Sequence, residues 1–152
     1  MNPAIYVSKP IDITDLDPDF YRADLEFHDI EHDGASYQAR VFVNNPTAGR
    51  DTPTDDASGY AGAFHVFGHG GCFGAPGHCD LKVPRPHDPR PGHPLTRAKK
   101  IVIATEAIRR ARRGGTSMTI TIVPVITGGT SKCRFDDVVK LQHINVKTYE
   151  DT

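Results

Sequence analysis

The sequence predicts an all-β fold, an antiparallel β-sandwich of about seven strands with one short helix and long loops. Apolar and polar residues alternate in several short runs, and no long stretch has the helical period of 3.6. Turn-forming residues fill long segments between these runs, which favours a sandwich over a closed barrel. A length of 152 residues fits one domain. We expect an N-terminal extension over residues 1–21 and the sandwich domain over residues 22–149.

The first strands are predicted over residues 22–30 (RADLEFHDI) and 37–44 (YQARVFVN). Asp33-Gly34 lies between them and is a strong hairpin signal, so we expect these two strands to pair. The next strand begins in YAGAFHVFGH, residues 60–69. Its alternation places Phe64 and Val66 on one face, and His65, Phe67 and His69 on the other.

Three further strands are predicted over residues 99–105, 117–126 and 137–149. The middle one is the clearest, because its apolar residues Met118, Ile120 and Ile122 alternate with threonines. In the last strand the apolar parity shifts near Gln142 and His143, as at a β-bulge.

One helix is predicted over EAIRRARR, residues 106–113. Thr105 is the expected cap, and Gly114-Gly115 is expected to end the helix with a left-handed residue. The four arginines of the helix are interpreted as a solvated face rather than a phosphate site. Residues 44–59 and the proline-rich residues 83–94 are predicted loops.

Composition argues against several classes of partner. The formal net charge of −1 predicts no nucleic-acid partner, and no apolar stretch approaches the ~20 residues that span a bilayer, so we expect no membrane partner. The N-terminus lacks a basic segment followed by an apolar run, so no secretory signal is predicted and the expected location is cytoplasmic. Three cysteines do not describe a disulfide scaffold, and clustered Cys and His in a reducing compartment are more often metal ligands.

The candidate metal site is in FHVFGHGGCFGAPGHC, residues 64–79. His65 and His69 are separated by about 13 Å on a straight strand, so they cannot both bind one ion. Glycines and a proline allow the chain to fold back, so four residues can converge: His69, Cys72, His78 and Cys79. Such a set suits zinc or cuprous copper. The alternative ligands are His65, His87 and His93.

Other interpretations of the same residues stay open. Cys72 and Cys79 have a separation that suits a short disulfide loop, and the segment also fits a glycine-rich hairpin with incidental histidines. His28 and His32 are also four residues apart, and we favour exposed residues of an edge strand over a second metal site. No nucleophile elbow, phosphate-binding loop or dinucleotide fingerprint is present, so enzymatic activity is uncertain and less expected than a non-catalytic role.

Five segments together resemble a known domain: ARVFVNNP, YAGAFHVFGHGGC, HPLT, TEAIRR and TITIVPV. They are similar to the β-sandwich domain that follows the catalytic domain in some tyrosinase, polyphenol oxidase and haemocyanin-like type 3 copper proteins. In that family a strand of the form R-V-F-V-N precedes an A-G-x-F strand, and residues 40–44 and 61–64 stand in those places. The resemblance covers roughly residues 22–149.

The resemblance implies an accessory role. Type 3 copper chemistry needs two coppers held by six histidines on a four-helix bundle, and neither the bundle nor the histidine sets are present in this sequence. The leading hypothesis is a non-catalytic sandwich that binds copper or zinc through the Cys/His loop and associates with a copper oxidase catalytic subunit. The alternatives are a structural module with a Cys72–Cys79 disulfide and no metal, and a small metalloenzyme with an open metal position. An exposed sheet edge would also allow a homo-oligomer.

Overall fold

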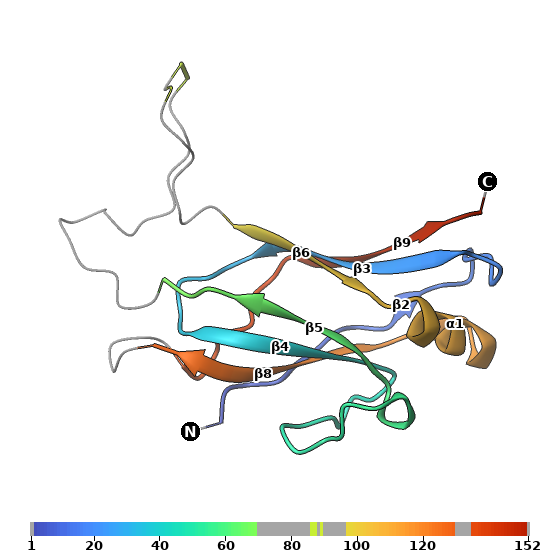
Figure 1. Ribbon diagram of the computed structural model, residues 1–152, viewed down its shortest axis with the longest axis horizontal. Coiled ribbons are helices and arrows are strands. Elements are labelled where there is room, and N and C mark those ends of the chain that lie inside the picture. Colours follow the sequence, from blue (N-terminus) through green and yellow to red (C-terminus); the bar gives the residue numbers. More distant parts are fainter. Residues whose placement is uncertain (1, 70–85, 88, 90–96, 130–134, 152) are drawn as a thin grey trace.

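The computed structural model describes residues 2–69, 86–87, 89, 97–129 and 135–151. In that part of the chain the strands form two packed layers with one helix at an end, so the predicted β-sandwich is confirmed (Figure 1). The elements are β1 (Tyr6–Val7), β2 (Ile11–Asp12), β3 (Arg22–Ile30), β4 (Ser36–Val43), η1 (Asp56–Ser58), β5 (Tyr60–Val66), β6 (Ala98–Ile103), α1 (Thr105–Gly114), β7 (Ser117–Met118), β8 (Ile120–Gly128) and β9 (His143–Tyr149).

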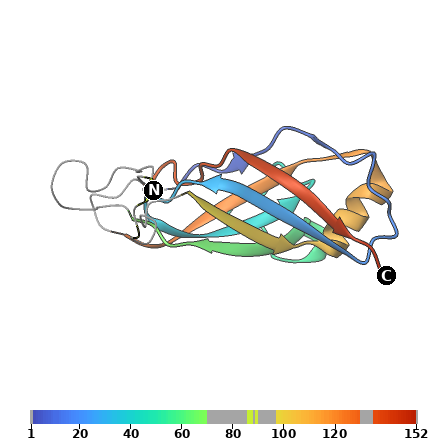
Figure 2. The ribbon, with the colours of Figure 1, turned by 90° about the horizontal axis from the view of Figure 1, so that it is seen from above.

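One layer is the four-stranded sheet β1-β8-β4-β5, and the other is the three-stranded sheet β6-β3-β9. Every pairing in both sheets is antiparallel. Figure 2 shows the strands running along one long axis, with α1 at one end. Within residues 1–21, β1 pairs with β8 and β2 pairs with β7, and Ile13 and Phe20 are buried. This segment therefore packs onto the sandwich.

The core lies between the two sheets because the alternating apolar residues of facing strands point inward. Phe27 of β3 and Phe64 of β5 join the layers, with ring centroids 4.8 Å apart. The main inward residues of the longer strands are Ala23, Leu25, Phe27, Tyr37, Ala39, Val41, Phe64, Val66, Val102, Ile120 and Ile122. No helix in the described part of the chain is long and apolar enough to cross a membrane.

The turn at Asp33-Gly34 connects the two layers. β3 pairs with β6 and β9, whereas β4 pairs with β5 and β8, so the predicted β3–β4 hairpin is wrong. Residues 31–35 separate the strands, too many for a two-residue hairpin turn. The inward faces of both strands are apolar, and placing them in opposite sheets buries these faces against each other.

α1 buries Ala107, Ile108 and Ala111 against the end of the sandwich. The expected cap is wrong: the residue before the helix is Ala104, which makes no side-chain capping bond. Thr105 instead accepts a hydrogen bond at its Oγ1 from the N–H of Ala23, at 3.2 Å. The predicted left-handed end is also wrong, because Gly115 has φ 170°, an extended conformation.

Two arginines of α1 hold the N-terminal segment. Arg109 donates from Nη2 to the carbonyl oxygen of Phe20 at 2.9 Å, and Arg112 donates from Nε to that of Leu16 at 3.2 Å. The prediction of a purely solvated arginine face is therefore wrong for these two residues. Their hydrogen bonds satisfy carbonyl groups of a segment outside the two main sheets.

The loop over residues 44–59 covers the outer face of β8. Phe42, Ala48 and Val123 form a second buried cluster with Tyr60 packed against it. Thr121, which alternates with the core residues, is also buried and donates from Oγ1 to the carbonyl oxygen of Asn45 at 2.9 Å. Both faces of this sheet are therefore covered in its central part.

β9 is shorter and more regular than expected. Its register against β3 is unbroken from Arg22–Tyr149 to His28–His143, so the predicted bulge near Gln142 and His143 is wrong. The register shift is in the β3–β6 pairing, between Phe27 and Ile30. The apparent parity change came from Val139 and Leu141, which lie before the strand begins at His143 and do not belong to its alternation.

Candidate functional site

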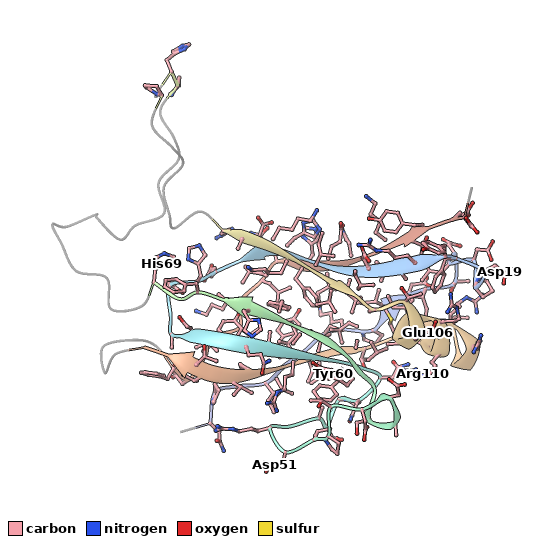
Figure 3. All side chains as sticks on the ribbon, viewed as in Figure 1. Asp19, Asp51, Tyr60, His69, Glu106 and Arg110 are labelled. Carbon is pink, nitrogen blue, oxygen red and sulfur yellow. The ribbon has the colours of Figure 1, made fainter. Side chains whose placement is uncertain are left out.

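The predicted metal ligands begin just beyond the end of β5. His69 is half-buried and lies at the end of the sandwich opposite to Glu106 and Arg110 (Figure 3). Cys72, His78, Cys79 and His93 lie outside the described residues. The convergence of His69 with the two cysteines and His78 therefore stays a prediction.

His69 faces a histidine from the connection between β3 and β4. The Nδ1 atoms of His32 and His69 are 2.8 Å apart, and the two rings are tilted by 59° with centroids 4.7 Å apart. The backbone N–H of His69 also donates to the carbonyl oxygen of His32, at 2.7 Å. For the two Nδ1 atoms to form a hydrogen bond, one ring must donate a proton and the other must accept it. Both nitrogens are therefore directed at the same small region of space.

Gly68 makes this approach sterically feasible. A Cβ atom at Gly68 would lie 2.2 Å from the carbonyl oxygen of Gly34 and 2.4 Å from the carbonyl carbon of Ala35. The N–H of Gly68 donates to Oγ of Ser36 at 2.9 Å. The end of β5 is thus held against the residue 31–35 connection, which carries His32.

Two of the alternative ligands, His65 and His87, lie in the described part of the chain. His65 is exposed on β5, in register with Gln38 of β4. His87 is exposed and has a positive φ of 67°.

A second histidine pair lies on the outer face of the three-stranded sheet. His28 is in the central strand β3 and His143 is directly opposite in β9, with ring centroids 4.4 Å apart and an interplanar angle of 7°. The side chain of His28 is 23% exposed, so its interpretation as an exposed residue of an edge strand is wrong. The sequence could not show this, because the neighbour strands of β3 come from much later in the chain.

Glu26 organises the charges beside the second pair. Its Oε1 is 3.3 Å from Nε2 of His28, and its Oε2 is 3.3 Å from Nζ of Lys99 on β6. Burial raises the pKa of Glu26, but the hydrogen bonds from His28 and Lys99 outweigh burial and hold the pKa below its ordinary value. The carboxylate is therefore stabilised in its ionised form.

A cavity of about 290 Å³ lies at the other end of the sandwich, between η1, the start of β5 and α1. Its polar lining includes Asp56, Tyr60, Glu106 and Arg110, and Arg110 lies 3.9 Å from Asp56. Among the described residues that line it there is no histidine or cysteine, so these side chains do not add to the candidate metal chemistry.

In the described ranges, no group of three or more His, Cys, Asp or Glu side chains is placed to bind one metal ion. The His32–His69 pair is smaller than such a group. Sequence reasoning identified His69 but not its contact with His32, and the only local signal was the position of His32 beside the Asp33-Gly34 turn. The contact between His32 and His69 depends on how the β3–β4 connection packs against the end of β5, and a local sequence pattern does not predict such packing.

The fold is similar to part of a polyphenol oxidase. Recombinant latent aurone synthase, a polyphenol oxidase, matches with a TM-score of 0.55 and 17% identity over 96% of this chain and 24% of that chain. The natural-source enzyme matches with a TM-score of 0.53 and 16% identity over 95% of this chain and 24% of that chain. The predicted resemblance to a domain of such oxidases is therefore confirmed at the level of the fold. No family model matches the chain, and no curated protein matches its sequence.

Proposed function

We propose that the chain is a non-catalytic accessory β-sandwich that associates with the catalytic part of a type 3 copper oxidase and binds copper or zinc. The observation that carries this proposal is the fold match, which spans nearly the whole of this chain but only 24% of the polyphenol oxidase. A domain that occupies a quarter of a relative is expected to act beside the remaining part.

The described residues support a role without oxidase chemistry. They contain one α-helix, α1, and no histidine lies on it. The resemblance implies that the two coppers of the oxidase are held by histidines of a helical bundle, so the partner would supply that chemistry. This chain would shield, stabilise or supply copper to the partner.

The outer surface of β6 is suited to such a contact. Ile101 is 48% exposed and Ile103 is 60% exposed, and they point away from the sandwich core on the same strand. Exposed apolar side chains that lie together favour burial against another protein. We assign this surface to the catalytic part of the oxidase.

The metal-binding part of the proposal uses the loop that follows β5. His69, Cys72, His78 and Cys79 are the proposed ligands, with His65, His87 and His93 as alternatives. Thiolate and imidazole ligands together suit zinc or cuprous copper. Support comes from the firm attachment of His69 to the sandwich through its backbone bond to His32.

Association can be tested with a type 3 copper catalytic domain that lacks its own sandwich domain. We expect a one-to-one complex in size-exclusion chromatography with light scattering, and slower phenol oxidation after the sandwich is added. Replacing Ile101 and Ile103 together by serine should weaken the complex, whereas Val7→Ser, at a residue of β1 that is 44% exposed, should not. The accessory role would be contradicted if the chain does not bind the catalytic domain and does not change its rate of phenol oxidation.

A further inference from the structure

We propose that His32 is a metal ligand and that the His32–His69 pair binds a divalent transition metal ion through its two Nδ1 atoms. Binding displaces the proton that lies between the two Nδ1 atoms, and this proton moves to Nε2 of the ring that donated it. This inference deepens the metal-binding part of the proposed function, with which it shares only His69. It does not use Cys72, His78 or Cys79.

The two ligand nitrogens lie at nearly the separation that they would have on one ion. The Nδ1 atoms are 2.8 Å apart, and the proton between them requires a lone pair directed along that line. With metal–nitrogen distances of about 2.0–2.1 Å, two nitrogens on a tetrahedral ion are about 3.3 Å apart. A tetrahedral ion lies to one side of the line between the nitrogens, so the nitrogens must separate by about 0.5 Å and each ring must turn by about 35° to direct its lone pair at the ion. Rotation about χ1 and χ2 of the two side chains supplies both changes.

The backbone positions of both histidines are set before any ion binds. The N–H of His69 is bonded to the carbonyl oxygen of His32 at 2.7 Å, and the N–H of Gly68 is bonded to Oγ of Ser36 at 2.9 Å. Gly68 lies so close to Gly34 that the two segments are in backbone contact. Because the ligands are already adjacent, little ordering is needed on binding.

The ligand chemistry selects the class of ion. Imidazole nitrogens suit copper, nickel and zinc, whereas calcium and magnesium prefer oxygen ligands. Among divalent ions at a nitrogen site, affinity rises to a maximum at Cu²⁺. We therefore expect Cu²⁺ to bind most tightly and Mg²⁺ not to bind.

The second histidine pair provides a contrast within the same molecule. The rings of His28 and His143 are nearly parallel, with an interplanar angle of 7° and centroids 4.4 Å apart. The nitrogen lone pairs lie in the ring planes, so those of stacked rings do not converge on one point. Nε2 of His28 is also within 3.3 Å of Glu26. His143 is therefore a suitable control position.

The test is a Cu²⁺ titration of the full chain with Cys72, Cys79 and Cys133 replaced by serine, so that no thiol binds or reduces the ion. Calorimetry measures affinity, and electron paramagnetic resonance counts coordinated nitrogens. We expect one Cu²⁺ per chain with two imidazole nitrogens. His32→Ala and His69→Ala should each weaken binding at least tenfold, and His143→Ala should leave it unchanged.

Circular dichroism verifies that each variant is folded, and His32→Gln replaces His32→Ala if alanine prevents folding. Unchanged affinity in the folded His32 variant, or a loss caused only by His143→Ala, would overturn the inference.

A parallel Zn²⁺ titration of the chain with its cysteines intact separates the two proposals. In one outcome, the chain with its cysteines binds Zn²⁺ while the cysteine-free chain binds neither ion. That result would support the loop site at His69, Cys72, His78 and Cys79 and would overturn the inference about His32. If neither chain binds either ion, both proposals fail.

Discussion

The two histidine pairs contain the same side chains in opposite arrangements. His28 and His143 are brought together by the register of neighbouring strands, and their rings stack on an open sheet face. His32 and His69 are brought together by a connection packed against a strand end, and their nitrogens face each other. Proximity alone is therefore a poor guide to metal chemistry, because the direction of the nitrogen lone pairs decides whether one ion can be shared.

The largest expected effect is from Gly68→Ala, which would disrupt the facing pair and spare the stacked pair. The new Cβ atom would meet backbone atoms of Gly34 and Ala35 at 2.2–2.6 Å, so the end of β5 must move away. We expect the free energy of unfolding to fall by about 3 kcal/mol. Urea denaturation measures the loss, and NMR of the imidazole signals locates it.

Gly49→Ala is the matched control, because nothing lies within 4 Å of a Cβ atom at Gly49. Its free energy of unfolding should stay near that of the wild type. If Gly68→Ala were equally harmless, the packing of the β5 end against the residue 31–35 connection would be wrong.

A smaller effect is expected from truncating one histidine of each pair. His69→Ala removes the Nδ1 hydrogen bond of a half-buried pair and should lower the free energy of unfolding by about 1 kcal/mol. His143→Ala removes an exposed ring from a strand at the edge of its sheet and should cost less than about 0.5 kcal/mol. Chemical denaturation of both variants in parallel gives the comparison, and a reversed order would contradict the assigned burial of the pairs.

The smallest effect is expected from Glu26→Gln, and it should depend on pH. Glu26 contacts His28 on its own strand and Lys99 on β6, and Asn145 of β9 is opposite in register. Burial raises its pKa, but the hydrogen bonds from His28 and Lys99 hold the folded-state pKa below the ordinary 4.5. The carboxylate therefore stabilises the fold above pH 4.5, and this stabilisation is lost as pH falls through the folded-state pKa.

Denaturation of the wild type and Glu26→Gln at pH 7 and pH 3 isolates this contribution. The wild type should be the more stable of the two at pH 7, and the difference should shrink at pH 3. A difference that grows on acidification would show that the carboxylate is not stabilised in its ionised form.

Local sequence patterns predicted the strands well and their partners poorly. The alternation in RADLEFHDI and the apolar run around Ile120 located β3 and β8 because side-chain direction repeats along a strand. Asp33-Gly34 signalled a turn correctly, but the expected hairpin was wrong because burial of two apolar faces placed β3 and β4 in opposite sheets. The last strand was extended too far because the buried pair Val138 and Val139 continues its apolar pattern.

The candidate site was also only partly predictable, because its local features were visible in the sequence and its tertiary contact was not. His69 was identified from the composition of its loop, which is a local property of the sequence. His32 was set aside because its spacing from His28 suggested nothing beyond a strand edge. Its contact with His69 depends on Gly68 meeting Gly34 across the end of the sandwich, a tertiary approach that spacing cannot reveal.

The most direct measurement is the metal content and free-thiol count of the protein purified without added metal and without a metal-binding tag. Mass spectrometry should find close to one copper or zinc ion per chain, with Cys72 and Cys79 unbridged. Replacing Cys72 by serine should then reduce the bound metal. A metal-free protein with Cys72 and Cys79 joined in a disulfide would contradict the metal-binding proposal and would instead support a structural module.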